Sequence, residues 1–311
     1  MIDLTKKRIV VTGGAGFLGS YIVEKLRARG CQDVFVPRSS EFDLRYLHDV
    51  LSMFEKFEPE IVIHAAAHAG GIGLNQKKPG ELFYDNALMG IHMIHEAVDF
   101  GVQKFVQVGT VCAYPKYAPT PFQESSLWNG YPEDTNAPYG VAKKALLVQG
   151  QAYKQQYGLN FIYLMPVNLY GPRDHFSLEY GHVIPVLVRR FTEAKANGIE
   201  SVTLWGTGKA SREFLYVEDA AEAVVLATER YNKAEPVNIG TGREIAIHDL
   251  AILVAKDVGY EGEIRYDSSR PDGQPSRCLD VSKAFEEFGF TASIDLNEGL
   301  RRTIAWYKEN L

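Results

Sequence analysis

The chain has little cysteine, and its three residues, Cys31, Cys112 and Cys278, are widely spaced in a sequence of 311 residues. An odd number of cysteines without a Cys-x-x-Cys pair predicts neither a disulfide framework nor a zinc site. A run of about 18 apolar residues, which a membrane-spanning helix requires, is also missing. Because the first residues lead into a predicted strand with no secretory apolar region, we expect a cytoplasmic protein without a membrane partner.

Positive charge is not in excess either. The 33 Lys and Arg residues are outnumbered by 39 Asp and Glu residues, and the formal net charge is -6. The charges form no basic stripe, which argues against a surface dedicated to nucleic acid. With 46% apolar residues and no internal repeat or low-complexity segment, the chain can bury one large core or two unequal ones.

A glycine-rich turn follows the first predicted strand, at residues 8–12, and precedes an amphipathic helix that we expect to end near Arg29. The spacing Gly-x-x-Gly-x-x-Gly allows positive backbone angles, close approach of a diphosphate and tight packing of helix on strand. The start of the helix also offers unpaired N–H groups to a phosphate. A strand before the turn and a helix after it are the context of a dinucleotide site. The predicted cofactor contacts in this turn are Gly13, Gly16, Phe17, Leu18 and Gly19.

The second predicted strand, at residues 33–36, ends where folds of this kind bind the adenosine ribose. An acidic residue at this point favours NAD, but the sequence continues Pro37-Arg38-Ser39-Ser40. A guanidinium and two hydroxyl groups suit the extra phosphate of NADP, so we predict NADP(H) as the cofactor. The alternative is that Arg38 is an ordinary solvated surface residue.

Strands and helices then alternate along the chain. Further strands are predicted at 61–64, 104–108 and 159–165, and helices at 47–57, 86–100 and 139–157. The alternation predicts an α/β fold with a Rossmann-type doubly wound parallel sheet, whose ligands bind beyond the carboxyl ends of the strands. We assign residues 1–171 to this domain, with segments near 216–240 returning to it. Residues 172–311 are assigned mainly to a smaller C-terminal α/β substrate lobe.

Tyr139 and Lys143 are one turn apart on the same face of a predicted helix. A phenol has a pKa of about 10, so it exchanges protons poorly at neutral pH unless a cation such as Lys143 stabilises its phenolate. The spacing alone also fits a tyrosine packed on a lysine stem, and the upstream motifs decide between the two.

The glycine turn, the hydroxyl residue Thr110 after a predicted central strand, and the Tyr139-x-x-x-Lys143 pair together resemble the extended short-chain dehydrogenase/reductase family. Within that family, five segments in the same order resemble the GDP-L-fucose synthases, which act on GDP-4-keto-6-deoxy-mannose. The resemblance covers nearly the whole chain. The five segments are 68–72, 112–116, 165–172, 181–185 and 270–273.

The resemblance implies an NADP-dependent enzyme that epimerises C3 and C5 of a GDP-linked 4-keto sugar and then reduces C4. It implies that Thr110, Tyr139 and Lys143 serve the reduction, whereas Cys112 and His182 exchange protons at C3 and C5. Lys143 and His182 are also expected beside the cofactor. The implied assembly is a homodimer, formed through the apolar helices 86–100 and 139–157. The expected substrate contacts are Asn168, Arg190, Trp205, Arg212 and Arg277.

The chemistry accounts for these residue types. A 4-keto group acidifies the hydrogens on both neighbouring carbons, so inversion needs a base on one side of the ring and an acid on the other. A partly ionised cysteine can act as the base, and a histidine can donate a proton near neutral pH. Tyr139 and Thr110 would donate hydrogen bonds to the enolate oxygen.

Two departures from the synthase pattern leave alternatives open. Val111 replaces a polar residue between Thr110 and Cys112, and the glycine turn lacks an arginine that some members place near the NADP phosphate. One alternative is a single-function reductase or epimerase acting on a GDP-4-keto hexose or heptose. Others are an NAD-dependent nucleotide-sugar 4-epimerase and, from another class, a nucleotide-sensing binding protein.

Overall fold

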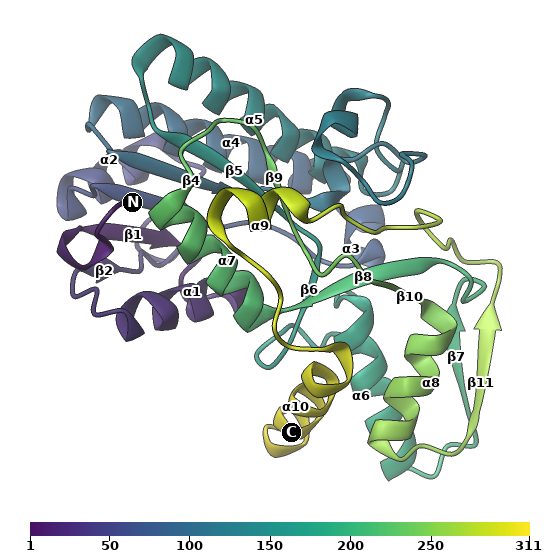
Figure 1. The fold of residues 1–311 in the computed structure, drawn as a ribbon. Helices are drawn as coiled ribbons and strands as arrows, with labels where there is room; N and C mark the ends of the chain where they lie inside the picture. Colours follow the sequence, from purple (N-terminus) through teal and green to yellow (C-terminus); the bar gives the residue numbers. More distant parts are fainter.

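The computed structural model describes residues 1–311 and has two lobes (Figure 1). The larger lobe is built on a six-stranded parallel sheet. Its strand order is β2-β1-β3-β4-β5-β9. From β1 the chain first adds β2 on one side and then β3 and the later strands on the other, so the switch point of the sheet lies between β1 and β3. This arrangement confirms the predicted Rossmann-type sheet. The strands are β1 (Ile9–Thr12), β2 (Val34–Phe35), β3 (Ile61–His64), β4 (Lys104–Val108), β5 (Phe161–Pro166) and β9 (Val237–Ile239).

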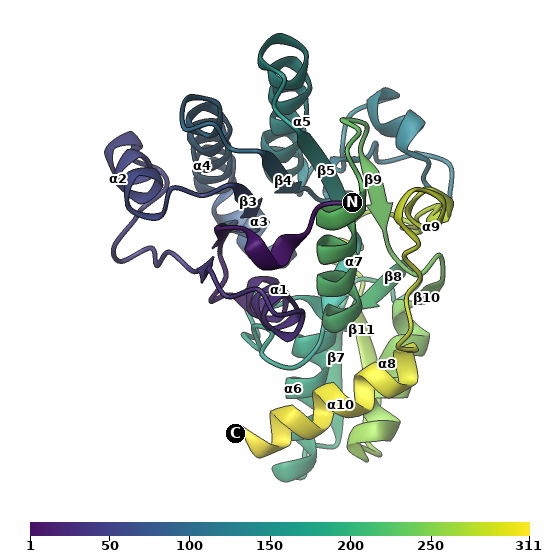
Figure 2. The same cartoon turned by 60° about the vertical axis from the view of Figure 1, so that its left-hand side comes forward.

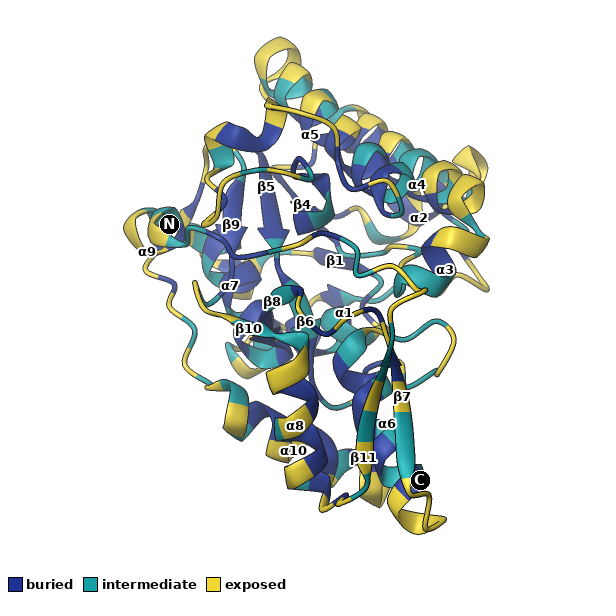
Figure 3. Ribbon diagram, turned by 90° about the vertical axis from the view of Figure 1, so that its right-hand side faces the viewer, coloured by how far each residue is buried: buried dark blue, intermediate teal, exposed yellow.

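Helices cover both faces of this sheet. In Figure 2, α1 and α7 lie on one face, and α2, α4 and α5 lie on the other. The central strands are therefore buried almost throughout (Figure 3), and in β4 this burial includes the polar residues Lys104 and Gln107. The helices are α1 (Phe17–Ala28), α2 (Leu47–Phe57), α3 (Ile72–Lys77), α4 (Pro79–Asp99), α5 (Ala137–Tyr157), α7 (Val217–Arg230) and α9 (Ser282–Phe288).

A smaller lobe has its own core of 18 buried residues, including Phe191, Phe214 and Val254. It contains the sheet β10-β8-β6 and the parallel pair β11-β7. Its strands are β6 (Asn168–Tyr170), β7 (Ser201–Trp205), β8 (Ser211–Tyr216), β10 (Glu244–Ala246) and β11 (Glu263–Asp267). Its helices are α6 (Val183–Ala196), α8 (Ile247–Val258) and α10 (Leu296–Glu309), and the chain also has three short 3-10 segments, η1 (Leu4–Lys6), η2 (Val111–Ala113) and η3 (Glu124–Trp128).

The chain passes between the two cores more than once. Strand β9 pairs with β5, and α7 packs on α1. Phe288 and Phe290, much later in the sequence, also belong to the larger core. We therefore propose a substrate lobe built from several chain segments, between which the chain returns to the cofactor domain.

Most predicted elements agree with the observed ones, and α4 differs most. The strands 61–64 and 104–108 and the helix 47–57 have the predicted bounds, but α4 begins at Pro79 instead of residue 86. Proline is favoured at a helix start because its φ is already helical. The first turns of α4 carry the exposed residues Phe83 and Tyr84, which hide the expected periodicity. None of the helices is both long and apolar enough to cross a membrane.

Glu213 on β8 connects the two lobes. Its carboxylate is fully buried and accepts hydrogen bonds from the backbone N–H groups of Thr241, Gly242 and Leu279. Leu279 belongs to the larger core. Burial raises the pKa of the Glu213 carboxyl, and the three N–H groups oppose that rise. The contact therefore positions the segment before α9 against β8.

We expect Glu213→Ala to lower the free energy of unfolding by about 3 kcal/mol, because buried N–H groups lose their acceptor. Urea-induced unfolding followed by circular dichroism measures the change. Glu261→Ala, at an exposed position, should alter the stability by less than about 0.5 kcal/mol. Equal stability changes in the two variants would contradict the role given to Glu213.

Candidate functional site

The glycine turn has the geometry of a phosphate-binding turn. Gly13 has a φ of 70°, and a Cβ at this position would lie 2.7 Å from the backbone nitrogen of Ala66. A Cβ on Gly19 would collide with the carbonyl of Gly13. Gly16 precedes α1, and no side chain caps this helix. The first N–H groups of α1, at Phe17 to Gly19, are therefore available to an anion.

A cleft of about 280 Å³ begins at this turn and is lined by Thr12, Gly13 and Gly16. Arg38 and Ser39, from the loop after β2, line its other side. The Arg38 side chain is exposed and forms no ion pair or hydrogen bond with the protein. A free guanidinium at the edge of this cleft fits the ribose phosphate of NADP.

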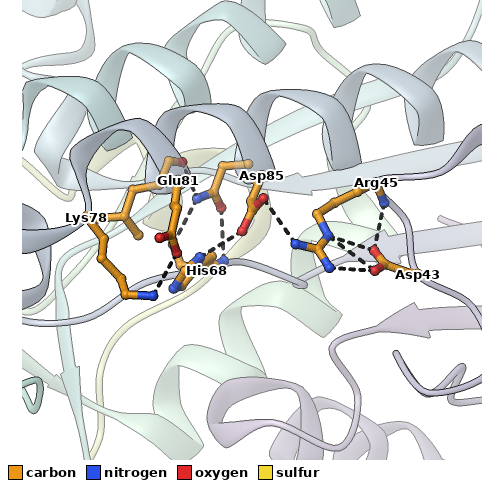
Figure 4. A network of polar contacts seen from close by, with 8 residues as sticks. Asp43, Arg45, His68, Lys78, Glu81 and Asp85 are labelled. Carbon is orange, nitrogen blue, oxygen red and sulfur yellow. Dashed lines mark hydrogen bonds and ion pairs between the residues drawn. The ribbon is translucent and has the colours of Figure 1, made fainter.

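A chain of polar contacts runs beside this cleft (Figure 4). Arg45 pairs with Asp43 at 2.6 Å and with Asp85 on α4 at 3.4 Å. The Asp85 carboxylate lies 2.9 Å from Nδ1 of His68, in the loop after β3. These contacts hold the loop after β2 against α4 and the loop after β3, and they leave Arg38 free.

Thr110, Cys112 and Tyr139 meet at the carboxyl end of β4. The Thr110 hydroxyl accepts a hydrogen bond from the backbone N–H of Cys112 at 3.2 Å. Helix α5, which carries Tyr139, packs so closely on this turn that a Cβ on Gly140 would collide with the Cys112 carbonyl. Val111, between Thr110 and Cys112 in the sequence, is 2% exposed and packs in the larger core. Replacing a polar residue by Val111 therefore does not remove a group from the site.

The electrostatics of the tyrosine-lysine pair differ from the expectation. Burial and the charge of a Cys112 thiolate raise the pKa of Tyr139, and a hydrogen bond with Thr110 opposes the rise. The Nζ of Lys143 donates to the Val108 carbonyl at 3.1 Å and forms no hydrogen bond with the Tyr139 hydroxyl. Burial lowers the pKa of Lys143 to about 8. Tyr139 is consequently a protonated phenol at neutral pH, which suits a proton donor.

Two arginines lie beside Cys112 and Tyr139. Arg212 comes from β8 in the smaller lobe, and Arg277 comes from the segment before α9. Arg277 contacts Asn168 at 3.1 Å and Cys112 at 3.6 Å. Arg212 on β8 donates to the carbonyls of Ser211 and Asp272. Burial and the nearby Arg277 lower the pKa of Arg212 to about 9. Neither guanidinium forms an ion pair with a carboxylate, so this part of the site attracts anions.

His182 lies in the other lobe, at the residue before α6, and is exposed. Its loop packs on the loop after β3, where the Gly71 N–H donates to the Tyr180 carbonyl at 2.8 Å. No hydrogen bond links His182 to Cys112, so the structure brings their loops to the same region without a direct contact.

Arg190 and Trp205 lie elsewhere on the smaller lobe, on α6 and at the end of β7. Arg190 on α6 donates to the Thr203 carbonyl at 2.7 Å, and burial lowers its pKa. The Arg270 guanidinium lies 5.0 Å from the centre of a Trp205 ring, and Trp205 is 41% exposed. No hydrogen bond or ion pair joins this group to Arg212 or Arg277.

Two residues at the site were not singled out from the sequence. Asp174 is buried and its Oδ2 has no partner. Burial raises the pKa of its carboxyl, and the positive charge of His182 opposes that rise. Gln274 is 2% exposed and accepts from Nε of Arg277. Asp174 follows the quoted 165–172 segment by two residues and Gln274 follows the 270–273 segment directly, so wider motif boundaries would have included both.

Residues 9–240 match the model of the NAD-dependent epimerase/dehydratase family. The chain is 43% identical to GDP-L-fucose synthase 1 of Arabidopsis thaliana over 304 residues, which cover 98% of this chain and 94% of that protein. It also resembles a solved GDP-L-fucose synthetase of Naegleria fowleri bound to NADP, with a TM-score of 0.90, 27% identity and coverage of 100% and 96% of the two chains. A solved GDP-6-OMe-4-keto-L-xylo-heptose reductase of C. jejuni has a TM-score of 0.90, 30% identity and 99% coverage of both chains. These similarities confirm the resemblance inferred from the motifs.

We expect Arg38→Ala to weaken NADPH binding about tenfold or more and to leave NADH binding nearly unchanged, because only NADPH carries the additional phosphate. Fluorescence titration of the full chain with each nucleotide measures both affinities. Arg45→Ala provides a control for disturbance of the same loop. Equal weakening of both nucleotides by Arg38→Ala would remove the argument for phosphate recognition.

Proposed function

The chain belongs to the NAD-dependent epimerase/dehydratase family, and we propose that it converts GDP-4-keto-6-deoxy-mannose to GDP-L-fucose. The reaction is epimerisation at C3 and C5 followed by NADPH-dependent reduction at C4, so the enzyme is both an isomerase and an oxidoreductase. One observation carries the proposal. Thr110, Cys112 and Tyr139 meet at the end of β4, beside the buried Arg277 and the half-buried Arg212, neither of which forms an ion pair with a carboxylate.

The protein supplies the groups that move protons. In the proposed reaction, the Cys112 thiolate removes a proton from the carbon beside the ketone, and His182 returns one on the opposite face. Tyr139 and Thr110 donate hydrogen bonds to the enolate oxygen. Since its pKa is raised, Tyr139 keeps its proton until it gives it to the same oxygen during reduction.

The cofactor and the GDP group fit separate parts of the site. When bound, NADPH supplies the hydride for C4, and the glycine turn, Arg38 and Lys143 are the residues that would hold it. Arg212 and Arg277 are suited to the diphosphate, because each guanidinium offers planar N–H donors to phosphate oxygens. Trp205 offers an exposed aromatic ring on which the guanine of the GDP group can stack. An NADPH-consuming enzyme of nucleotide-sugar metabolism suits the cytoplasm, which we propose as its location.

The decisive experiment is incubation with GDP-4-keto-6-deoxy-mannose and NADPH in D₂O, followed by NMR of the product. We expect GDP-L-fucose with deuterium at C3 and C5. A D-configured product without deuterium would indicate a reductase alone, and exchange without NADPH oxidation an epimerase alone. Turnover of only a GDP-4-keto heptose would favour the activity named for the C. jejuni relative.

We expect Cys112→Ser to oxidise NADPH with the keto sugar but to give an unepimerised D-sugar. A serine hydroxyl hardly ionises near neutral pH, so deuterium incorporation should fall at least about 100-fold. His182→Asn should likewise slow epimerisation and leave hydride transfer possible. NMR of the product and NADPH absorbance separate the two activities.

Tyr139→Phe should show the opposite pattern, with NADPH oxidation suppressed and slow deuterium exchange retained. The reason is that the phenylalanine ring keeps the packing but has no proton to donate. A Cys112→Ser variant that forms the L-sugar at nearly the normal rate would exclude Cys112 as the base.

We further propose that the protein is a homodimer. Helices α4 and α5 pack closely, since a Cβ on Gly90 would collide with the Leu146 side chain. Their outer face keeps apolar residues exposed, and Gln149 hydrogen bonds to the Ile91 carbonyl across this face. Two copies that join these faces would form a four-helix bundle. The exposed apolar residues on the two helices are Phe83, Tyr84, Ile91, Val148 and Tyr157.

We expect the double variant Ile91→Lys, Val148→Lys to be a monomer, because opposed lysines would repel at the centre of the bundle. Light scattering at micromolar protein measures the mass of variant and parent. Ile252→Lys on α8, where the parent side chain is 48% exposed, should leave the dimer intact. A monomeric parent protein would contradict the proposed assembly.

A further inference from the structure

A buried arginine contacts the proposed base. Arg277 is 6% exposed, and its Nη1 lies 3.6 Å from Sγ of Cys112 and 3.1 Å from Oδ1 of Asn168. Its Nε donates to Oε1 of Gln274 at 3.2 Å. The partners of this buried cation therefore include no carboxylate, and the thiol is the one group among them that can ionise to an anion.

The orientation of the guanidinium is fixed from the segment that follows Cys112. The Nε2 group of Gln274 donates to the carbonyls of Pro115 and Lys116, at 3.1 and 3.3 Å. Because the amide nitrogen is held by these two carbonyls, its oxygen faces Arg277. The turn that carries Cys112 thus also holds the arginine in place. Nη2 makes no hydrogen bond with the protein and remains available for a substrate phosphate.

The charges around the thiol reinforce this contact. Arg212 on β8 and Tyr139 on α5 both interact electrostatically with Cys112. The carboxylates Glu133 and Asp272 act on Arg212, which they stabilise in its charged form. Arg277 is the cation with a direct contact to Sγ, and Arg212 adds a second positive charge nearby.

We propose that Arg277 is a positioning residue that holds Cys112 as a thiolate and so prepares it to act as the base. The thiol gives its proton to solvent, and the guanidinium pairs with the sulfur anion. The thiolate then takes a proton from the carbon beside the ketone, and the C–H electron pair passes to the enolate oxygen. This inference rests on the proposed function for the identity of the substrate. It gives Arg277 a role before any GDP-linked sugar binds.

Alkylation of the full chain by iodoacetamide, without any sugar, tests this role because only a thiolate reacts rapidly. Cys31 and Cys278 are buried, and burial raises the pKa of Cys278 to about 12, so the reaction reports on Cys112. Mass spectrometry of the modified peptides follows the rate at each pH. We expect Cys112 of the parent to be alkylated readily at neutral pH, where an ordinary thiol is mostly protonated and reacts slowly.

We expect Arg277→Gln to slow alkylation at neutral pH about tenfold or more, since the thiolate loses a directly paired cation. Arg277→Lys keeps a positive charge and should stay close to the parent rate. Arg212→Gln removes a cation that does not touch the sulfur and should have a smaller effect. These matched variants separate charge at the thiol from general disturbance of the site.

An unchanged rate and pH profile of alkylation in Arg277→Gln would overturn the inference. If Arg277→Gln does not fold, as judged by thermal unfolding, Gln274→Leu frees Nε of the arginine and must slow alkylation for the inference to stand.

Deuterium exchange into the keto sugar is measured separately. Failure of every GDP-4-keto sugar to react contradicts the proposed function, and the alkylation profile still decides whether Arg277 activates Cys112.

Discussion

Buried positive charge without a carboxylate partner is the constraint on which this site depends. Lys143, Arg212 and Arg277 are held by carbonyls, amides and a thiol. Carbonyls and amides orient a cation but do not neutralise it, and removing an ion from water still costs several kcal/mol after relaxation. The cost appears in the pKa values of Lys143, about 8, and Arg212, about 9. A site of this kind gains stability when an anionic ligand enters.

The two lobes are arranged so that neither contains the site alone. The larger core supplies the thiol and phenol at the end of β4, whereas β8 supplies Arg212. Arg277 belongs to the segment before α9, which is fixed to β8 by Glu213 and to the larger core by hydrogen bonds between Phe122 and the backbone of Cys278 and Asp280. The position of the cations relative to the thiol therefore depends on packing between lobes.

The sequence predicted the parallel sheet well because short segments rich in Val, Ile and Phe, such as 61–64 and 104–108, alternate with helical patterns. The proposed cofactor contacts Gly13 and Arg38 could also be predicted, because the glycine turn and the end of the second strand are local sequence features. The protonation state of Tyr139 was not predictable, because it depends on burial and on the neighbouring Cys112 and Thr110. Residues 112 and 277 are 165 positions apart, so their contact arises only from tertiary packing.

The electrostatic coupling between Cys112 and Tyr139 links the protonation states of the two side chains. A thiolate at Cys112 raises the pKa of Tyr139, which keeps the phenol protonated while the base is ready to act. Once the thiol has accepted a proton from the sugar, that effect disappears and the phenol becomes a stronger acid. Burial still holds the pKa of Tyr139 above its ordinary value, so the phenol remains protonated and available to donate to the oxygen at C4 during reduction.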